Sequence, residues 1–182
     1  AENGVVSVVN RVLTPLPSID EYLGSKPEYS EFKKIFDKYL VEYVLNPAVT
    51  QRYRNLTGSA ADVFTKVFNS SLAFSPNNEN FLKVQDNDGQ SNTYSLFVPT
   101  NTVLLEYINR VLLEHYNSLD EMPRNVLYDF VNAHMWQTVV WPSKFNNTFS
   151  FLGEPARFNP NTDVVDKKVL SNGFFYGTSK VQ

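Results

Sequence analysis

The sequence predicts an α+β fold in which a sheet packs against several helices on one side. Three observations support this: an amphipathic helical pattern from Tyr29, a strong strand over Thr93–Thr100, and a tail from Phe145 in which apolar and polar residues alternate. The chain has 182 residues, of which 42% are hydrophobic and 19% are charged. We therefore expect one globular domain with a proper hydrophobic core.

The N-terminal part is expected to hold one strand and two helices. Val5–Val12 is rich in β-branched residues and follows Asn-Gly, as a short buried strand does. Ser18 can cap a helix over Ile19–Leu23. From Tyr29 to Val44, apolar residues recur on one helical face and charged residues occupy the other, which predicts a long helix. The apolar face comprises Tyr29, Phe32, Ile35, Phe36, Tyr39, Leu40, Tyr43 and Val44.

The middle of the chain is polar and is expected to contain short elements. Asn46-Pro47 ends the long helix, and residues 47–61 favour a partly helical segment. Residues 62–85 predict a strand, a loop and a second strand ("VFTKVF", "SPNNEN", "FLKVQ"). Asp86–Gly89 predicts a turn. The strand "TYSLFVPT" follows and stops at Pro99.

Helices and then strands are expected after this strand. One helix is predicted over Val103–Tyr116, and a second from Pro123 through His134. The stretch "WQTVVW" has the composition of a strand. The tail alternates apolar and polar residues around Gly153, Asn161 and Asn172, which predicts β-hairpins.

Composition argues against several classes of partner and chemistry. The net charge is −3 and there is no run of Lys or Arg, so we expect no binding to nucleic acid or to an anionic membrane. No apolar stretch reaches the roughly 18 residues that a membrane span needs, so we expect no direct membrane insertion. The chain has no Cys, which removes disulfides, thiolate metal sites and Cys nucleophiles. We expect no cofactor.

Three segments, in order, resemble the signatures of fasciclin-like domains. They are "YSLFVPTN" (Tyr94 to Asn101), "LYDFVNAHM" (Leu127 to Met135) and "VVDKKVLSNGFFYGTSKV" (Val164 to Val181). The resemblance implies β-sheets that form a wedge or sandwich packed against helices. The chain departs from the pattern at Ala133, where the family has Tyr before the His. It also departs in the roughly fifty residues, Leu45–Thr93, that intervene where the family has a short loop.

The first residues resemble the closing signature of a preceding domain of the same kind. "NGVVSVVNRVL" shares its Asn-Gly, apolar run and basic residue with the segment that begins at Asn172. We therefore expect residues 1–16 to be the closing strand of a preceding fasciclin-like domain plus a linker, in a tandem repeat. Residues 17–182 would be the downstream domain, with an insertion at about 45–93.

Six residues carry the family motifs, and each is expected to have a structural role: Pro99, Thr100, Asn101, His134, Asn172 and Gly173. Pro99 stops the strand, and the side chains of Thr100 and Asn101 can cap the following helix. The resemblance implies that His134 is mostly buried and hydrogen-bonded to residues of this Pro-Thr-Asn turn. Asn172 and Gly173 form the Asn-Gly turn of the closing signature.

The resemblance implies a non-enzymatic adhesion or scaffolding module of a bacterial surface or secreted protein, such as a lipoprotein. Its location would be extracellular or at the cell surface (periplasmic or anchored to the outer membrane). The partner would be a surface protein or a glycan, with the insertion as the specificity determinant. A hydrolase is disfavoured because no G-x-S-x-G motif is present. A zinc site is disfavoured because the chain has two His and no Cys.

An alternative function is carbohydrate binding, as an accessory module of a system that handles surface polysaccharides. Trp136, Trp141 and Phe145 lie close together in the sequence, near Phe149 and Phe151. Exposed aromatic rings stack on sugar rings or fill pockets of a partner, whereas aromatic residues of strands are more often part of the core. These three residues are the candidate partner-binding patch, and both interpretations of them stay open at this point.

Overall fold

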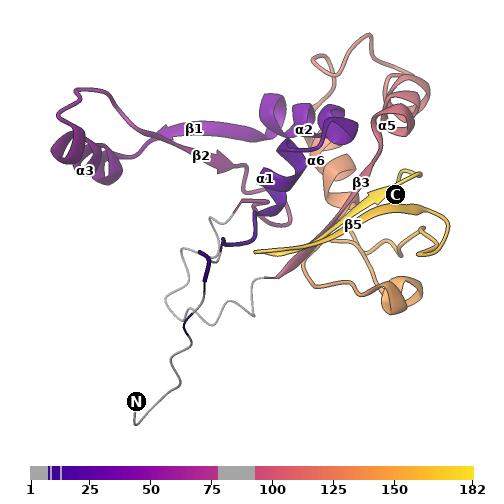
Figure 1. The fold of residues 1–182 in the computed structure, drawn as a ribbon. Coiled ribbons are helices and arrows are strands. Elements are labelled where there is room, and N and C mark those ends of the chain that lie inside the picture. Colours follow the sequence, from indigo (N-terminus) through magenta and orange to yellow (C-terminus); the bar gives the residue numbers. More distant parts are fainter. Residues whose placement is uncertain (1–7, 9, 13, 78–92) are drawn as a thin grey trace.

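The computed structural model describes residues 8, 10–12, 14–77 and 93–182 (Figure 1). It has the expected α+β class, with strands in two sheets and several helices. The helical segments are α1 (Ile19–Gly24), η1 (Pro27–Tyr29), α2 (Ser30–Ile35), η2 (Phe36–Leu40), α3 (Pro47–Thr57), α5 (Asn101–Tyr107), η4 (Ile108–Leu112), α6 (Arg124–Ala133) and η5 (Pro142–Asn147). The strands are β1 (Val41–Leu45), β2 (Phe64–Phe68), β3 (Tyr94–Pro99), β4 (Met135–Trp136), β5 (Val164–Leu170) and β6 (Gly173–Thr178).

The larger sheet has four described strands in the order β4-β3-β6-β5. Its centre is the parallel pair β3 and β6, in which Tyr94 lies beside Gly173 and Pro99 beside Thr178. β5 and β6 form the antiparallel hairpin that the tail predicted, turning at Ser171 and Asn172. Because successive side chains of a strand point to opposite faces, each central strand supplies apolar residues to both sides of this sheet.

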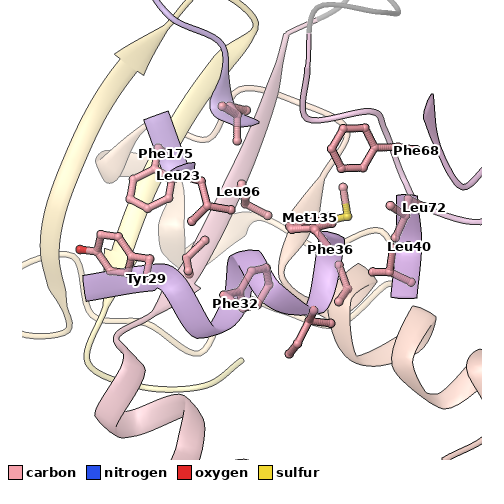
Figure 2. Close-up of a cluster of buried hydrophobic side chains, with 14 of the residues drawn as sticks. Leu23, Tyr29, Phe32, Phe36, Leu40, Phe68, Leu72, Leu96, Met135 and Phe175 are labelled. Atoms are coloured by element: carbon pink, nitrogen blue, oxygen red, sulfur yellow. The ribbon is translucent and has the colours of Figure 1, made fainter. Parts of the chain in front are cut away.

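Helices cover one face of the sheet, and the main core lies between these helices and the sheet. Leu96 and Phe175 project from the sheet into the cluster that includes Phe32 of α2 (Figure 2), and the Phe175 ring lies edge-on to that of Tyr29. The ring of Phe32 lies edge-on to that of Phe36, at 5.5 Å between centroids. The apolar face predicted from Tyr29 to Leu40 is therefore confirmed as far as Leu40, and it is the face that enters the core.

A second core covers the opposite face of the sheet. Phe97 stacks on Phe158 at 5.0 Å and lies 4.4 Å from Trp136, while Tyr176 and Phe145 complete the cluster. Within the described part of the chain, no helix longer than η5 belongs to the cover of this side. Its cover is the short 3₁₀ helix η5 together with the irregular segments around it.

The long helix predicted to Val44 ends at Leu40, and the extension to Tyr43 and Val44 was wrong. Its last turn is π-helical, and the chain then enters β1, which pairs with β2 so that Val41 lies opposite Phe68. "VEYVL" carries β-branched and aromatic residues that also suit a strand, and "FTKVF" supplies the partner. Pairing with β2, which is 19 to 27 residues further along the chain, decides that this segment is a strand.

The β1–α3–β2 segment projects from the body as an arm (Figure 1). The two-stranded sheet of the arm extends away from the four-stranded sheet. The arm begins at Val41, slightly before the insertion expected at about 45–93. The partly helical segment expected at 47–61 is confirmed as α3, Pro47–Thr57.

Other boundaries differ modestly from expectation. The helix expected over Val103–Tyr116 is α5 followed by a π-helical turn that ends at Leu112. Of the strand-like "WQTVVW" (136–141), only Trp136 belongs to the sheet, as the second residue of β4. Most of the expected strand at 5–12, the strand at 81–85 and the turn at 86–89 lie outside the described residues. Among the helices described, none has the length and apolar character needed to cross a bilayer.

Candidate functional site: a projecting arm and an aromatic groove

The arm, residues 41–68, carries an apolar face out of the core and into solvent. Residues that lie opposite each other in an antiparallel strand pair have their side chains on the same face. Tyr43 lies opposite Lys66, and Leu45 lies opposite Phe64. Phe68 on this face is buried in the main core, whereas Tyr43 is 67% exposed and Phe64 is 55% exposed. The face of the β1–β2 sheet that enters the main core therefore continues along the arm into solvent, where no described residue covers it.

The helix at the tip of the arm is held by its own hydrogen bonds. Asn46 caps α3 by accepting a bond from the Val49 N–H at 3.1 Å, and Gly58, with φ +70°, ends the helix. The Thr50 hydroxyl accepts a bond from the N–H of Val63, the residue just before β2. These contacts make the tip a defined structure on which exposed side chains have fixed places.

A second apolar stripe runs along α3. Val49, Tyr53 and Leu56 follow the spacing of one helical face, and all three are exposed. Leu56 is the extreme case at 86% exposure. A helix face of this kind is normally buried against the body, whereas on α3 it is exposed to solvent.

An ionic cluster of two lysines and two aspartates fixes the root of the arm. Lys66 of β2 lies 3.0 Å from Asp20 of α1 and 3.0 Å from Asp37 of η2, and Lys33 of α2 bonds to both acids. Burial works against the charge on Lys66, but hydrogen bonds to the two carboxylates raise its pKa above the ordinary value. Burial alone would raise the pKa of Asp37, yet hydrogen bonds from the two lysines lower it.

Sequence analysis did not identify Lys66 as an anchor. The available signal was the alternation in "FTKVF", which places this lysine on the same face as Phe64 and Phe68. A charge on an otherwise apolar face needs a partner. Its acidic partners come from elements separated in sequence by more than twenty residues, so no local pattern named them.

Two of the three aromatic residues expected to form an exposed patch are in the second core. Trp136 is 0% exposed and Phe145 is 1% exposed, so neither ring can stack on a partner at the surface. The physical reason is that Trp136 belongs to β4 and packs on Phe97 of the neighbouring strand. Trp141 differs, since it is 56% exposed.

Trp141 lies at one end of a shallow groove on the second-core face of the β5–β6 hairpin. Its ring lies edge-on to Phe174 at 4.9 Å between centroids. Two adjoining hollows, of about 300 Å³ and 320 Å³, share Pro142, Lys167 and Tyr176 in their walls. The first also includes Trp141 and Phe174, and the second includes Ser143 and Asn161. The groove therefore runs from an aromatic end to a polar end.

His134 is fully buried, as the resemblance implied, but the hydrogen-bond partners expected for it were wrong. Nδ1 lies 2.8 Å from the carbonyl oxygen of Phe130, and Nε2 accepts a bond from the Gln182 N–H at 3.2 Å. Neither partner belongs to the Pro-Thr-Asn turn. Burial lowers the pKa of His134 to about 4 against the opposing effect of the Phe130 carbonyl, so the ring is neutral at pH 7.

The Pro-Thr-Asn turn also works differently from the expected side-chain cap. Pro99 does end β3, but neither Thr100 nor Asn101 caps α5 with its side chain. Asn101 instead accepts a bond from the Glu31 N–H and donates one to the Pro27 carbonyl, which ties α5 to the first turn of α2 and to η1. Thr100 donates its backbone N–H to Thr178 of β6.

Asn172 has an analogous joining role at the β5–β6 turn. Its amide oxygen accepts a bond from the Ile19 N–H, and its amide nitrogen donates to the Pro76 and Asn77 carbonyls. Gly173 follows with φ +146°, where a Cβ atom would overlap the backbone of Tyr94 on β3. The fold therefore needs the amide group of Asn172 to join these segments and the missing Cβ atom of Gly173 to let β3 and β6 pair.

In the described part of the chain, no group of three or more His, Asp or Glu residues is arranged to hold a metal ion. In comparisons with known proteins, no family model matches this chain and no curated protein matches it.

Proposed function

We propose that this chain is a non-catalytic adhesion or scaffolding module of the fasciclin-like kind, which works at the cell surface and captures a partner through its arm. The observation that carries the proposal is the exposed apolar surface of the arm. Side chains such as Tyr43, Tyr53 and Phe64 would normally be buried, and here they are displayed on an anchored extension. Aromatic residues of this kind dominate binding energy at protein interfaces.

The motif residues support the fasciclin-like assignment. β3, the Pro-Thr-Asn turn and α5 occur in the expected order, followed by the buried His134 and the hairpin that turns at Asn172. Asn101 and Asn172 each connect separate elements through side-chain hydrogen bonds, as structural motif residues do. The arm replaces what is a short loop in the family pattern, which makes it the element that distinguishes this chain.

The proposal is tested by removing the arm without disturbing its root. Tyr43 and Lys66 lie opposite each other, so residues 44–65 can be replaced by Asn-Gly, a two-residue turn suited to antiparallel strands. Beads coated with the intact chain should adhere to cells of the organism that produces it. Beads coated to equal density with the shortened chain should not adhere.

A matched pair of point variants locates the contact more finely. Phe64 on the arm and Phe149 on the body are 55% and 60% exposed. Phe64→Ser should weaken adhesion strongly, and Phe149→Ser should leave it unchanged. Adhesion that survives loss of the arm, or that falls equally in both point variants, would refute capture by the arm. Far-UV circular dichroism checks that each variant is folded.

A further inference from the structure

The groove beside Trp141 combines unneutralised positive charge with an aromatic wall. Lys167 lines both hollows and Lys168 lines one of them, and no Asp or Glu is present in either wall. Neither lysine forms an ion pair with any residue that the structure describes. In a chain of net charge −3, this local excess favours an anionic ligand.

The distribution of lysines over the molecule strengthens this point. The structure describes nine lysines, and the six outside this region are paired with acids: Lys26, Lys33, Lys34, Lys38, Lys66 and Lys180. The other three are Lys167 and Lys168 of β5 and Lys144 of η5, the helix whose residues Pro142, Ser143 and Phe145 line the groove. Among the described residues, the lysines without an ion pair are thus all on β5 and η5, whereas the arginines without one (Arg11, Arg52 and Arg124) lie outside the groove walls.

The aromatic end of the groove indicates a second property of the ligand, an apolar ring face. Trp141 is half-exposed, and its edge-on contact with Phe174 holds the ring in place. A fixed, exposed ring of this kind suits stacking against the apolar face of a sugar ring. At the other end, Ser143 and Asn161 are exposed and offer a hydroxyl and an amide to sugar hydroxyl groups.

The size of the groove limits the ligand to a small number of rings. Each hollow is at the lower end of the roughly 300–1,000 Å³ found for ligand pockets, and the two adjoin along Pro142, Lys167 and Tyr176. We propose that this groove binds an acidic oligosaccharide, with one sugar ring stacked on Trp141 and a ring carboxylate paired with Lys167. This site is separate from the arm, and the inference does not depend on capture by the arm.

The direct test compares two ligands that differ only in charge. Trimers of galacturonic, glucuronic and mannuronic acid are titrated into the intact chain, each beside its methyl ester, which keeps the rings and hydroxyls but not the charge. By isothermal titration calorimetry at low salt, at least one acid should bind with a Kd below about 1 mM. It should bind about fivefold more tightly than its ester, and added salt should shrink this difference.

Two variants separate the stacking contact from the charge contact. Trp141→Ala should weaken binding of the acid and of the ester by about two- to tenfold, because both ligands lose the stacked ring. Lys167→Gln should bring the acid to the affinity of the ester. Tyr53→Ala and Lys34→Gln are the matched controls, an aromatic residue of the arm and a lysine of α2, and neither should change the affinity.

Four results would overturn the proposal. They are no measurable binding of any acid trimer, equal affinity for acid and ester, affinity that survives Trp141→Ala, and binding of inorganic polyphosphate or phosphatidylserine vesicles as tight as that of the trimer. The last result would identify a general anion-binding patch or a membrane-binding surface instead. The variant in which Asn-Gly replaces residues 44–65 should bind the acid trimer normally, so failure at one site is distinguishable from failure at the other.

Discussion

At the scale of single residues, His134 makes the stability of the fold depend on pH. The ring is fully buried, and its Nε2 accepts the N–H of Gln182, which requires that nitrogen to be unprotonated. The pKa in the folded chain is about 4, against an ordinary value of 6.5. Between these two values the unfolded chain binds more protons than the folded chain, so the free energy of unfolding falls as the pH is lowered.

We predict that His134 accounts for a loss of about 3 kcal/mol of stability between pH 7 and pH 4, since one pKa unit corresponds to about 1.4 kcal/mol. The measurement is urea unfolding at a series of pH values for the intact chain and for His134→Gln, whose amide can serve both hydrogen bonds without titrating. Other groups, such as Asp37, contribute to both chains alike. Parallel pH profiles for the two chains would contradict the prediction.

Gly173 offers a second test at this scale. Gly153 and Gly173 both have positive φ, at +80° and +146°, but only at Gly173 would a Cβ atom overlap neighbouring backbone. Gly153→Ala should cost about 1–2 kcal/mol from the backbone conformation alone. Gly173→Ala should cost more than about 4 kcal/mol, because β3 and β6 must also separate. Thermal unfolding measures both, and equal costs would show that the contact with Tyr94 yields readily.

Sequence reasoning located these residues better than it located their partners. The motifs picked out Asn101, His134 and Asn172, and all three make structural hydrogen bonds. The expected partners were wrong for His134 and Asn101, because Gln182 and Pro27, which bond to them, come from segments distant in sequence. A local pattern records that a polar side chain is needed at a position, but the fold determines which backbone group it meets.

At the scale of elements, the arm shows where periodicity reaches its limit. The pattern from Tyr29 fits a helix through Val44, yet the helix ends at Leu40. The segment that follows pairs with β2, and only the tertiary structure reveals this pairing. Sequence reasoning did identify the inserted region, its helical part and the strand β2, because a polar helix and the alternation in "VFTKVF" each carry a local signal, whereas β1 was expected to be helical.

We predict that the ionic root controls the mobility of the arm. Lys66→Gln removes the side chain that joins β2 to Asp20 and Asp37, so amide hydrogen exchange in β1 and β2 should speed up. The global free energy of unfolding should fall by only about 1 kcal/mol, because Lys33 still neutralises both acids. Lys34→Gln, which breaks an exposed pair with Glu31, is the control. Unchanged exchange in the arm would show that backbone pairing alone holds it.

At the scale of the whole molecule, the four-stranded sheet serves two cores at once. Leu96 and Val98 face the main core, and Phe97 between them faces the second. This arrangement explains why the expected patch of Trp136, Trp141 and Phe145 is mostly interior. Clustering in sequence indicated that these aromatic residues lie together, but exposure depends on what covers the sheet. Here η5 and the irregular segments around it supply that cover and leave Trp141 outside.

Because the same strands line both cores, we predict that the body unfolds as one cooperative unit and that the arm contributes little to its stability. Trp136 lies in the second core, so tryptophan fluorescence reports that side, while far-UV circular dichroism follows the helices of the main core. The two transitions in urea should coincide.

Phe97→Ala should shift both transitions together by about 3–5 kcal/mol. The variant removes a ring packed on Trp136, Phe145, Phe158 and Tyr176. Replacing residues 44–65 with Asn-Gly should shift both by less than about 1 kcal/mol, as expected of exposed positions. A fluorescence transition that precedes the loss of helical signal would mean that the second core folds separately from the first.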